Sequence, residues 1–145
     1  MGVRKAHISC SKKPALSASS VNGRKLTYIL AVNKPVKCKD GRSRIVYIGT
    51  TKTGVARIAA SVSDKSERAL KKHGQSRIEA FVLTCPPRPK VEMWKVLERA
   101  AIAAFKREYQ QLPEFNTRGK SFKWRDVKRY FQEETLLKRL RTFET

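Results

Sequence analysis

The chain has 145 residues, of which 40% are apolar, so it is long enough for one domain with a buried core. Its 33 lysine and arginine residues far exceed its 12 acidic residues, and the formal net charge of +21 makes a folded domain repel itself. The excess predicts a polyanionic partner, and nucleic acid fits best, because lysine and arginine release condensed counterions from phosphates. No apolar run approaches the roughly 18 residues of a membrane span, so we expect no membrane-spanning segment.

The cysteines and the first residues bear on location. Cys10, Cys38 and Cys85 are odd in number and have no CxxC spacing. With no signal peptide predicted, they favour free thiols in a reducing compartment, so we expect a cytoplasmic location, in the nucleoid or another DNA-containing compartment. Residues 1–24 are basic, serine-rich and free of acidic residues. They indicate either a flexible phosphate-binding arm or a targeting segment.

A hairpin is the first predicted element after this arm. LTYILAV from Leu26 and RIVYI from Arg44 are rich in β-branched and aromatic residues, which is typical of strands. Pro35, Asp40 and Gly41 lie between the two runs and favour turns. We therefore expect two antiparallel strands joined by a long basic loop.

Two short helices and a third strand are predicted next. Thr53 is placed to cap a first helix, and Ser63 and Asp64 are placed to start a second one that Gly74 closes. RIEAFVLT, at 77–84, then predicts the third strand.

The last third of the chain predicts two more helices. Pro89 is placed to open a helix over about 90–111, and apolar spacing beyond Pro113 predicts a final amphipathic helix. The order β-β-α-α-β-α with a last helix indicates an α/β (α+β) domain, with a small three-stranded, mostly antiparallel sheet flanked by helices. We divide the chain into the arm 1–24, a core 25–119 and a basic C-terminal helix, 120–145, packed on that core.

Four polar residues stand out against this frame. Tyr28 and Tyr47 alternate with apolar residues on paired strands, so they face one surface, although a core position is the simpler interpretation of each alone. Glu98 falls on the apolar side of its helix, where a charge is costly unless it is paired, protonated or bound to a metal. Taken alone, Glu98 fits a boundary position that reaches solvent, and Arg57 fits a solvated arginine.

Together these residues resemble the GIY-YIG nucleases. Tyr47-Ile48-Gly49 is similar to the second signature strand of that family, and Lys52 to the basic residue that often follows it. Arg57, ten positions after Tyr47, is similar to the arginine of the family's first helix.

Three further matches extend the resemblance over about residues 25–119. Glu98 is similar to the family's helix glutamate, and Asn116 in LPEFN to the asparagine after a proline-bearing turn. Of the first signature strand only Tyr28, in LTY, matches. The resemblance implies a GIY-YIG-like fold and the hydrolysis of phosphodiester bonds.

The family also implies a role for each residue. Glu98 would hold one Mg²⁺ (or Mn²⁺), because Mg²⁺ keeps several waters and is often bound by few carboxylates plus phosphate oxygens. Arg57 would grip the scissile phosphate as its negative charge grows. Tyr47 would orient or deprotonate the attacking water, helped by Tyr28. A phenol is mostly protonated at neutral pH, so a basic Tyr47 needs a cationic neighbour, for which Lys52 or Arg57 is placed.

One position departs from the family pattern. Many members carry histidine or tyrosine one helical turn after the arginine, where this chain has Ser61. Serine is a poor general base at neutral pH, so Tyr47 or a water held by the metal must do that work, or activity is lost. We expect Gly49 to let the backbone approach a phosphate, and Asn116 to brace the site.

Basic residues around this site are expected to contact phosphates, which position DNA without reading its sequence. They come from the hairpin loop and from the stretch after Asn116, and they are Lys34, Lys37, Lys39, Arg42, Arg44, Arg118, Lys120, Lys123, Arg125, Lys128 and Arg129.

Two functions fit these features. The first is a metal-dependent DNA endonuclease that acts on duplex or branched DNA, with specificity supplied by a homodimer or by a protein partner. The second is a non-catalytic basic nucleic-acid-binding protein, either ribosomal in type or an inactive GIY-YIG relative. Arg57 and Glu98 favour the enzyme, because a binding protein has no need of a carboxylate that faces phosphate.

Overall fold

Strand β2, Leu26–Lys37, is the centre of an antiparallel sheet. Its first seven residues are all buried, which reflects an unbroken run of apolar and hydroxyl side chains. The structure, a computed structural model, describes residues 5–6, 8–10 and 25–145. Strand β3, Arg42–Thr51, lies on one side of β2, and β4, Ile78–Thr84, on the other, giving the order β1-β4-β2-β3.

The fourth strand, β1, was not expected. Ser9–Cys10 pairs antiparallel with Thr84 and Leu83 of β4, and Ile8 beside it is fully buried. The prediction of a three-stranded sheet is therefore one strand short, and that of a flexible arm is wrong for this segment, because Ile8 fills part of the core. The other arm residues, 1–4, 7 and 11–24, lie outside the described residues.

The hairpin between β2 and β3 is tighter than its sequence indicates. Only residues 38–41 join the two strands, with Gly41 at a φ of 75°. The register shifts between Leu30 and Ala31, and again before Val36, so irregular pairing carries the basic segment within the strands. The long basic loop was therefore a wrong prediction, because most of it is strand.

Helix α1, Val55–His73, replaces the two short helices that the sequence predicts. Ser63 and Asp64 are exposed in its middle, where their side chains need no capping role. Gly54, at a φ of 80°, precedes the helix in place of the expected Thr53 cap, and Gly74 closes it in the left-handed conformation, as predicted.

Helix α2, Met93–Tyr109, begins later than expected, because Arg88 and Val91 form an isolated bridge around Lys90, whose φ is 61°. The predicted final helix is two pieces: a 3₁₀ turn, η2, at Trp124–Asp126, and helix α3, Glu133–Arg141. This segment packs on the core through its buried residues, Val127, Phe131, Leu136, Leu137, Leu140 and Phe143.

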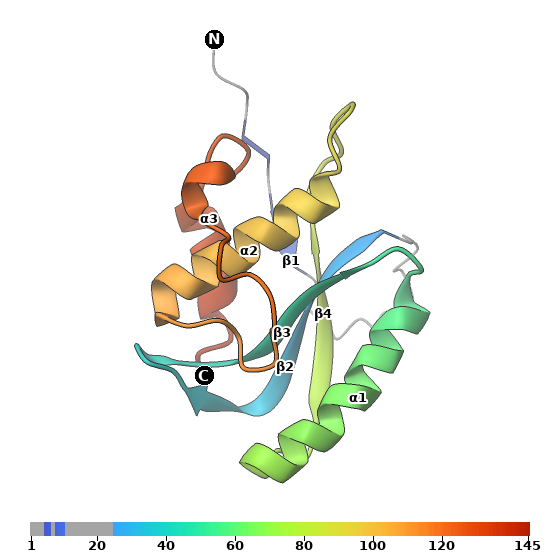
Figure 1. Ribbon diagram of the computed structural model, residues 1–145, viewed down its shortest axis with the longest axis vertical. Coiled ribbons are helices and arrows are strands. Elements are labelled where there is room, and N and C mark those ends of the chain that lie inside the picture. Colours follow the sequence, from blue (N-terminus) through green and yellow to red (C-terminus); the bar gives the residue numbers. More distant parts are fainter. Residues whose placement is uncertain (1–4, 7, 11–24) are drawn as a thin grey trace.

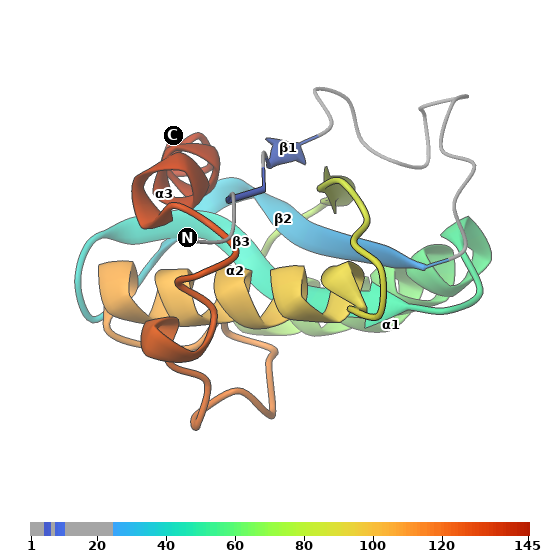
Figure 2. The same ribbon diagram turned by 90° about the horizontal axis from the view of Figure 1, so that it is seen from above.

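The sheet is covered on both faces. Figure 1 shows α1 on one side of the sheet, with α2 and α3 together on the other, and Figure 2 shows the same layers from above. One apolar cluster joins α1 to Leu26, Tyr28 and Leu30, and a larger one joins α2 and α3 to Ile29 and Ile48. Within the described part of the chain, no helix has both the length and the apolar character needed to cross a membrane.

The continuity of α1 is testable with proline. In the middle of a helix, Ser63→Pro removes a backbone hydrogen bond and clashes with the preceding turn, at a cost of about 3 kcal/mol. We expect urea unfolding to report a loss of this size, whereas Ser63→Ala leaves the free energy of unfolding nearly unchanged. If a second helix started at this position, proline would be tolerated in its first turn, and the two variants would have equal free energies of unfolding.

Candidate active site

The candidate site lies along β3, the edge strand of the sheet. Tyr28 pairs with Gly49 and Leu30 with Tyr47, so the side chains of Tyr28 and Tyr47 point to the α1 side of the sheet, and Gly49 lies on that same face. Thr50 points to the opposite side, toward α2, where its hydroxyl meets Glu98. One strand therefore presents polar groups to both faces within four residues, from 47 to 50.

On the α1 side, Tyr28, Tyr47, Arg57, Ser61 and Lys65 form what we call the phenol cluster. The two tyrosine rings are 6.0 Å apart between centroids, and the buried Ser61 hydroxyl lies near the phenol of Tyr28. Arg57 is exposed at the start of α1, near enough for its charge to act on Tyr28. The structure therefore brings together four of the residues that the sequence predicts.

The two phenols differ in environment. Burial raises the pKa of Tyr28, and the Ser61 hydrogen bond and the charges of Lys65 and Arg57 only partly oppose this effect. Tyr28 is therefore neutral at physiological pH and serves as a hydrogen-bonding partner. Tyr47 is half-buried, so it is the phenol that a water or a phosphate can reach.

Gly49 has a different role from the one expected. A Cβ atom at this position would lie 2.5 Å from Cε2 and 3.0 Å from the hydroxyl of Tyr47. The space above Gly49 therefore holds the Tyr47 ring, where the sequence predicts a phosphate. Glycine is required here because only a bare backbone lets the ring fold down along its own strand.

Lys65 is the member of the phenol cluster that sequence reasoning missed. Its ammonium lies 4.6 Å from the centroid of the Tyr47 ring, and its side chain is only 15% exposed, although it also pairs with Asp64 at 3.1 Å. The signal was present in the sequence: Arg57, Ser61 and Lys65 are spaced by four residues and so share one face of a continuous helix.

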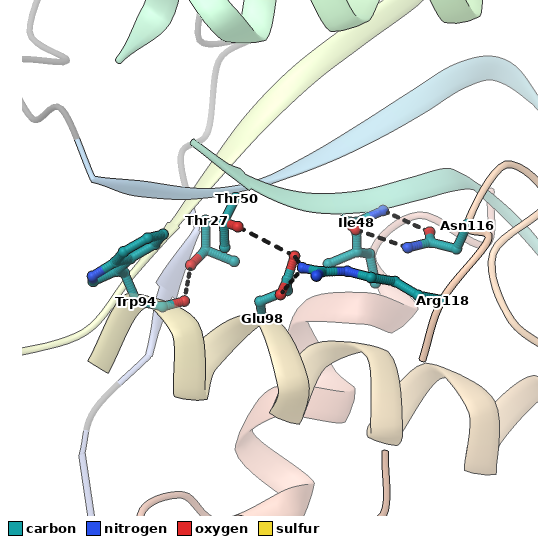
Figure 3. A network of polar contacts seen from close by, with 7 residues as sticks. All are labelled: Thr27, Ile48, Thr50, Trp94, Glu98, Asn116 and Arg118. Carbon is teal, nitrogen blue, oxygen red and sulfur yellow. Dashed lines mark hydrogen bonds and ion pairs between the residues drawn. The ribbon is translucent and has the colours of Figure 1, made fainter. Parts of the chain in front are cut away.

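Glu98 lies on the other side of β3. It is only 5% exposed, and its carboxylate accepts a hydrogen bond from the Thr50 hydroxyl at 3.3 Å (Figure 3). The guanidinium of Arg118 donates to both carboxylate oxygens, at 3.2 and 3.5 Å. The predicted position on the apolar face of the helix is correct, and strand β3 separates this carboxylate from the phenol cluster.

Asn116 holds the loop after α2 against the edge of β3. Its side-chain amide donates to the Ile48 carbonyl at 2.9 Å, and its oxygen accepts from the Ile48 amide at 3.0 Å. The amide of Phe115 adds a third bond, to Val46, at 2.8 Å. The asparagine side chain thus pairs with the edge strand as another strand would, and it holds the loop to β3.

Glu98 fits a Mg²⁺ site of the water-rich kind. Among the residues described, no three acidic, histidine or cysteine side chains gather as a metal cage. Glu98 and Thr50 nevertheless offer hard oxygen donors, and the partner that now balances the carboxylate, Arg118, has a side chain 72% exposed. An exposed arginine is displaced at little cost, so one carboxylate with waters and phosphate oxygens satisfies the cation's needs.

The basic residues expected to contact phosphate divide into two groups. Arg118 is engaged with Glu98, and Arg44 is half-buried over the ring of Phe143, 5.2 Å from its centroid. The others have exposed side chains on β2, β3, the hairpin turn and the C-terminal segment: Lys34, Lys37, Lys39, Arg42, Lys120, Lys123, Arg125, Lys128 and Arg129. Lys52 is exposed in the turn between β3 and α1.

Comparison of the chain with protein family models, with curated proteins and with solved structures found no match.

The Asn116 brace predicts a stability effect. Asn116→Ala removes both side-chain bonds to Ile48 and leaves two backbone groups of an edge strand without partners. We expect a loss of about 1–3 kcal/mol in the free energy of unfolding, measured with urea. Thr117→Ala, at the exposed next position, is the matched control and should change it by less than about 0.5 kcal/mol. Equal losses in the two variants would contradict the brace.

Proposed function

We propose that the protein is a metal-dependent endonuclease of the GIY-YIG type that hydrolyses DNA phosphodiester bonds. The observation that carries the proposal is that the two faces of β3 present different polar groups. On one face, this edge strand presents an accessible phenol with two cations beside it. On the other face, Thr50, three residues further along the strand, contacts the buried carboxylate of Glu98 from α2. A side chain on each face of an edge strand can reach a phosphate that lies across the edge.

The chain's own residues account for most of the reaction. Arg57, planar and always charged, binds the non-bridging oxygens of the scissile phosphate and stabilises the charge that grows on them. Tyr47 orients the attacking water and accepts its proton. Tyr47 must act as its phenolate in this step, and the ammonium of Lys65 lies over its ring as the neighbouring cation. Tyr28, which stays neutral because burial raises its pKa, packs against the Tyr47 ring and fixes its orientation.

Glu98 is the residue that would hold the cation, with Thr50 orienting the carboxylate. When bound, Mg²⁺ or Mn²⁺ supplies Lewis-acid stabilisation of the negative charge on the phosphate oxygens. Arg118 would leave the carboxylate if a cation were bound there, and its guanidinium would then be available to a neighbouring phosphate. This exchange keeps a buried carboxylate balanced by positive charge with and without the metal.

The proposal gives the role of helper base to Tyr47 and not to Ser61. The Ser61 hydroxyl lies near the phenol of Tyr28, and Lys65 brings a positive charge to the same helix face one turn later. The alternative is a non-catalytic nucleic-acid-binding protein, which would use the same exposed lysines and arginines. Such a protein has no use for Glu98 or Lys65, so these two residues separate the proposals.

Plasmid cleavage tests the proposal directly. We expect the protein to nick supercoiled DNA in Mg²⁺ or Mn²⁺ at low salt, and Arg57→Ala or Glu98→Gln to lower the rate by at least about 100-fold. DNA binding should persist in both variants. Arg77→Ala and Glu67→Gln remove exposed charges from α1 and its flank, and they should cleave like the wild type. Cleavage that survives Glu98→Gln would refute the proposed chemistry.

The role of Lys65 is testable on the same substrate. Lys65→Met keeps the aliphatic stem over Tyr47 but removes the charge, so we expect kcat to fall about 10- to 100-fold while KM changes little. Lys65→Arg restores a cation and should recover most of the rate. A purely structural lysine would behave differently, because Met would then be tolerated as well as Arg.

A further inference from the structure

Trp94, one helical turn before Glu98, lines two adjoining pockets at the start of α2. The larger has a volume of about 290 Å³ and the smaller of about 90 Å³, and both are also lined by Lys25 and Cys85. Pro87, Val91 and Met93 complete the apolar wall of the larger one. Its size is at the lower end of the roughly 300–1,000 Å³ range of small-molecule sites, which suits one planar ring system.

The Trp94 pocket, as we call this pair, is fixed relative to the candidate metal carboxylate. The hydroxyl of Thr27 donates to the Trp94 carbonyl at 2.6 Å, and Thr27 is the strand partner of Thr50, which binds Glu98 (Figure 3). Side chains at positions i and i+4 of a helix are about 5–6 Å apart at Cβ. Trp94 and Glu98 are therefore neighbours on one helix, so a base bound at the indole would belong to a nucleotide close to a phosphate at Glu98.

The chemistry of the Trp94 pocket matches a nucleobase. A half-exposed indole offers a stacking surface that any base can use, because every base has a π-face. Lys25 in the wall supplies positive charge beside that surface. The ammonium of Lys95, 5.4 Å from the centroid of the Trp94 ring, is paired at 3.4 Å with Glu92, which also lines the larger pocket. Burial raises the pKa of the Cys85 thiol to about 11, so the thiol adds no opposing charge.

A base inside a duplex cannot enter such a pocket, because it is stacked and paired. We propose that the Trp94 pocket binds the base of an unpaired nucleotide adjoining the phosphate at Glu98. The substrate is therefore DNA that contains an unpaired nucleotide at or next to the cleaved bond. This inference rests on the proposed nuclease function, and it adds a substrate class to it.

Binding in the absence of metal tests the Trp94 pocket without relying on cleavage. Three labelled DNAs are titrated in EDTA and followed by anisotropy: a duplex with one extrahelical adenine, the same duplex with an abasic residue at that position, and the fully paired duplex. One base–aromatic stack corresponds to a preference of about 5- to 150-fold for the extrahelical base over the abasic residue. We expect the wild type to show a preference in this range.

Variants assign the preference to one side chain. Trp94→Ala should bring the ratio of the two affinities close to one, and Trp94→Phe should keep most of it. Trp124→Ala truncates the chain's other tryptophan, which lies in the C-terminal segment, and should leave the affinity ratio unchanged. Circular dichroism and urea unfolding check that each variant is folded, and the phenylalanine variant keeps the test valid if the alanine variant is not.

The outcomes separate this inference from the nuclease proposal. A wild type that cleaves plasmid but binds the extrahelical and abasic duplexes equally overturns the Trp94 pocket alone, as does a preference that survives Trp94→Ala. A Trp94-dependent preference supports the pocket even if no DNA is ever cleaved. Failure to bind any of the three DNAs overturns both.

Discussion

The buried carboxylate of Glu98 needs a positive partner, because an isolated charge away from water is costly. In the structure that partner is Arg118, whose position depends on the loop that Asn116 fastens to β3. The carboxylate, the loop and the edge strand are therefore one unit. The buried carboxylate needs a positive partner, and its present partner, Arg118, is exposed to solvent. Glu98 is therefore suited to exchanging this arginine for a metal ion.

The same loop joins the two faces of the sheet. Phe115 packs in the cluster under α1, with the guanidinium of Arg68 over its ring, while Glu114 pairs with Lys72 and lies 3.6 Å from His73. The hydrogen bond from Lys72 is the main cause that lowers the pKa of Glu114. The end of α1 is thus tied to the segment that carries Asn116, which fixes the phenol cluster relative to Glu98 even though β3 lies between them.

Much of this arrangement could be predicted, and the failures have physical causes. Alternation placed Tyr28 and Tyr47 on one face, and the apolar spacing of α2 placed Glu98 among buried residues, because both patterns depend on local periodicity. The strand at Ser9–Cys10 could not be found, because two residues carry no periodicity and their partners in β4 are 73 and 75 positions away. Ser63 and Asp64 act as helix caps only where a helix begins. Here the buried face of α1 continues past them to Ala69, so the helix is not interrupted.

The site shows the same limit. Lys65 was missed because two separate helices were expected, and the four-residue spacing from Arg57 has meaning only in one continuous helix. Arg118 was predicted to contact DNA, and its ion pair with Glu98 was missed. That pair depends on the path of a loop, which the sequence does not reveal. Gly49 matched the family pattern, but the reason for glycine is the ring of Tyr47, a contact between residues two apart on one strand.

The central claim is that Glu98 is a metal-binding carboxylate for which Arg118 and the cation compete. Titration of the DNA-free protein with Mn²⁺, followed by electron paramagnetic resonance, measures this competition directly. The account predicts that Glu98→Gln abolishes the protein's specific Mn²⁺ binding, and that Arg118→Ala strengthens it because the competing cation is gone. Mn²⁺ affinities that are the same in the wild type and in Glu98→Gln, or weaker in Arg118→Ala, would contradict it.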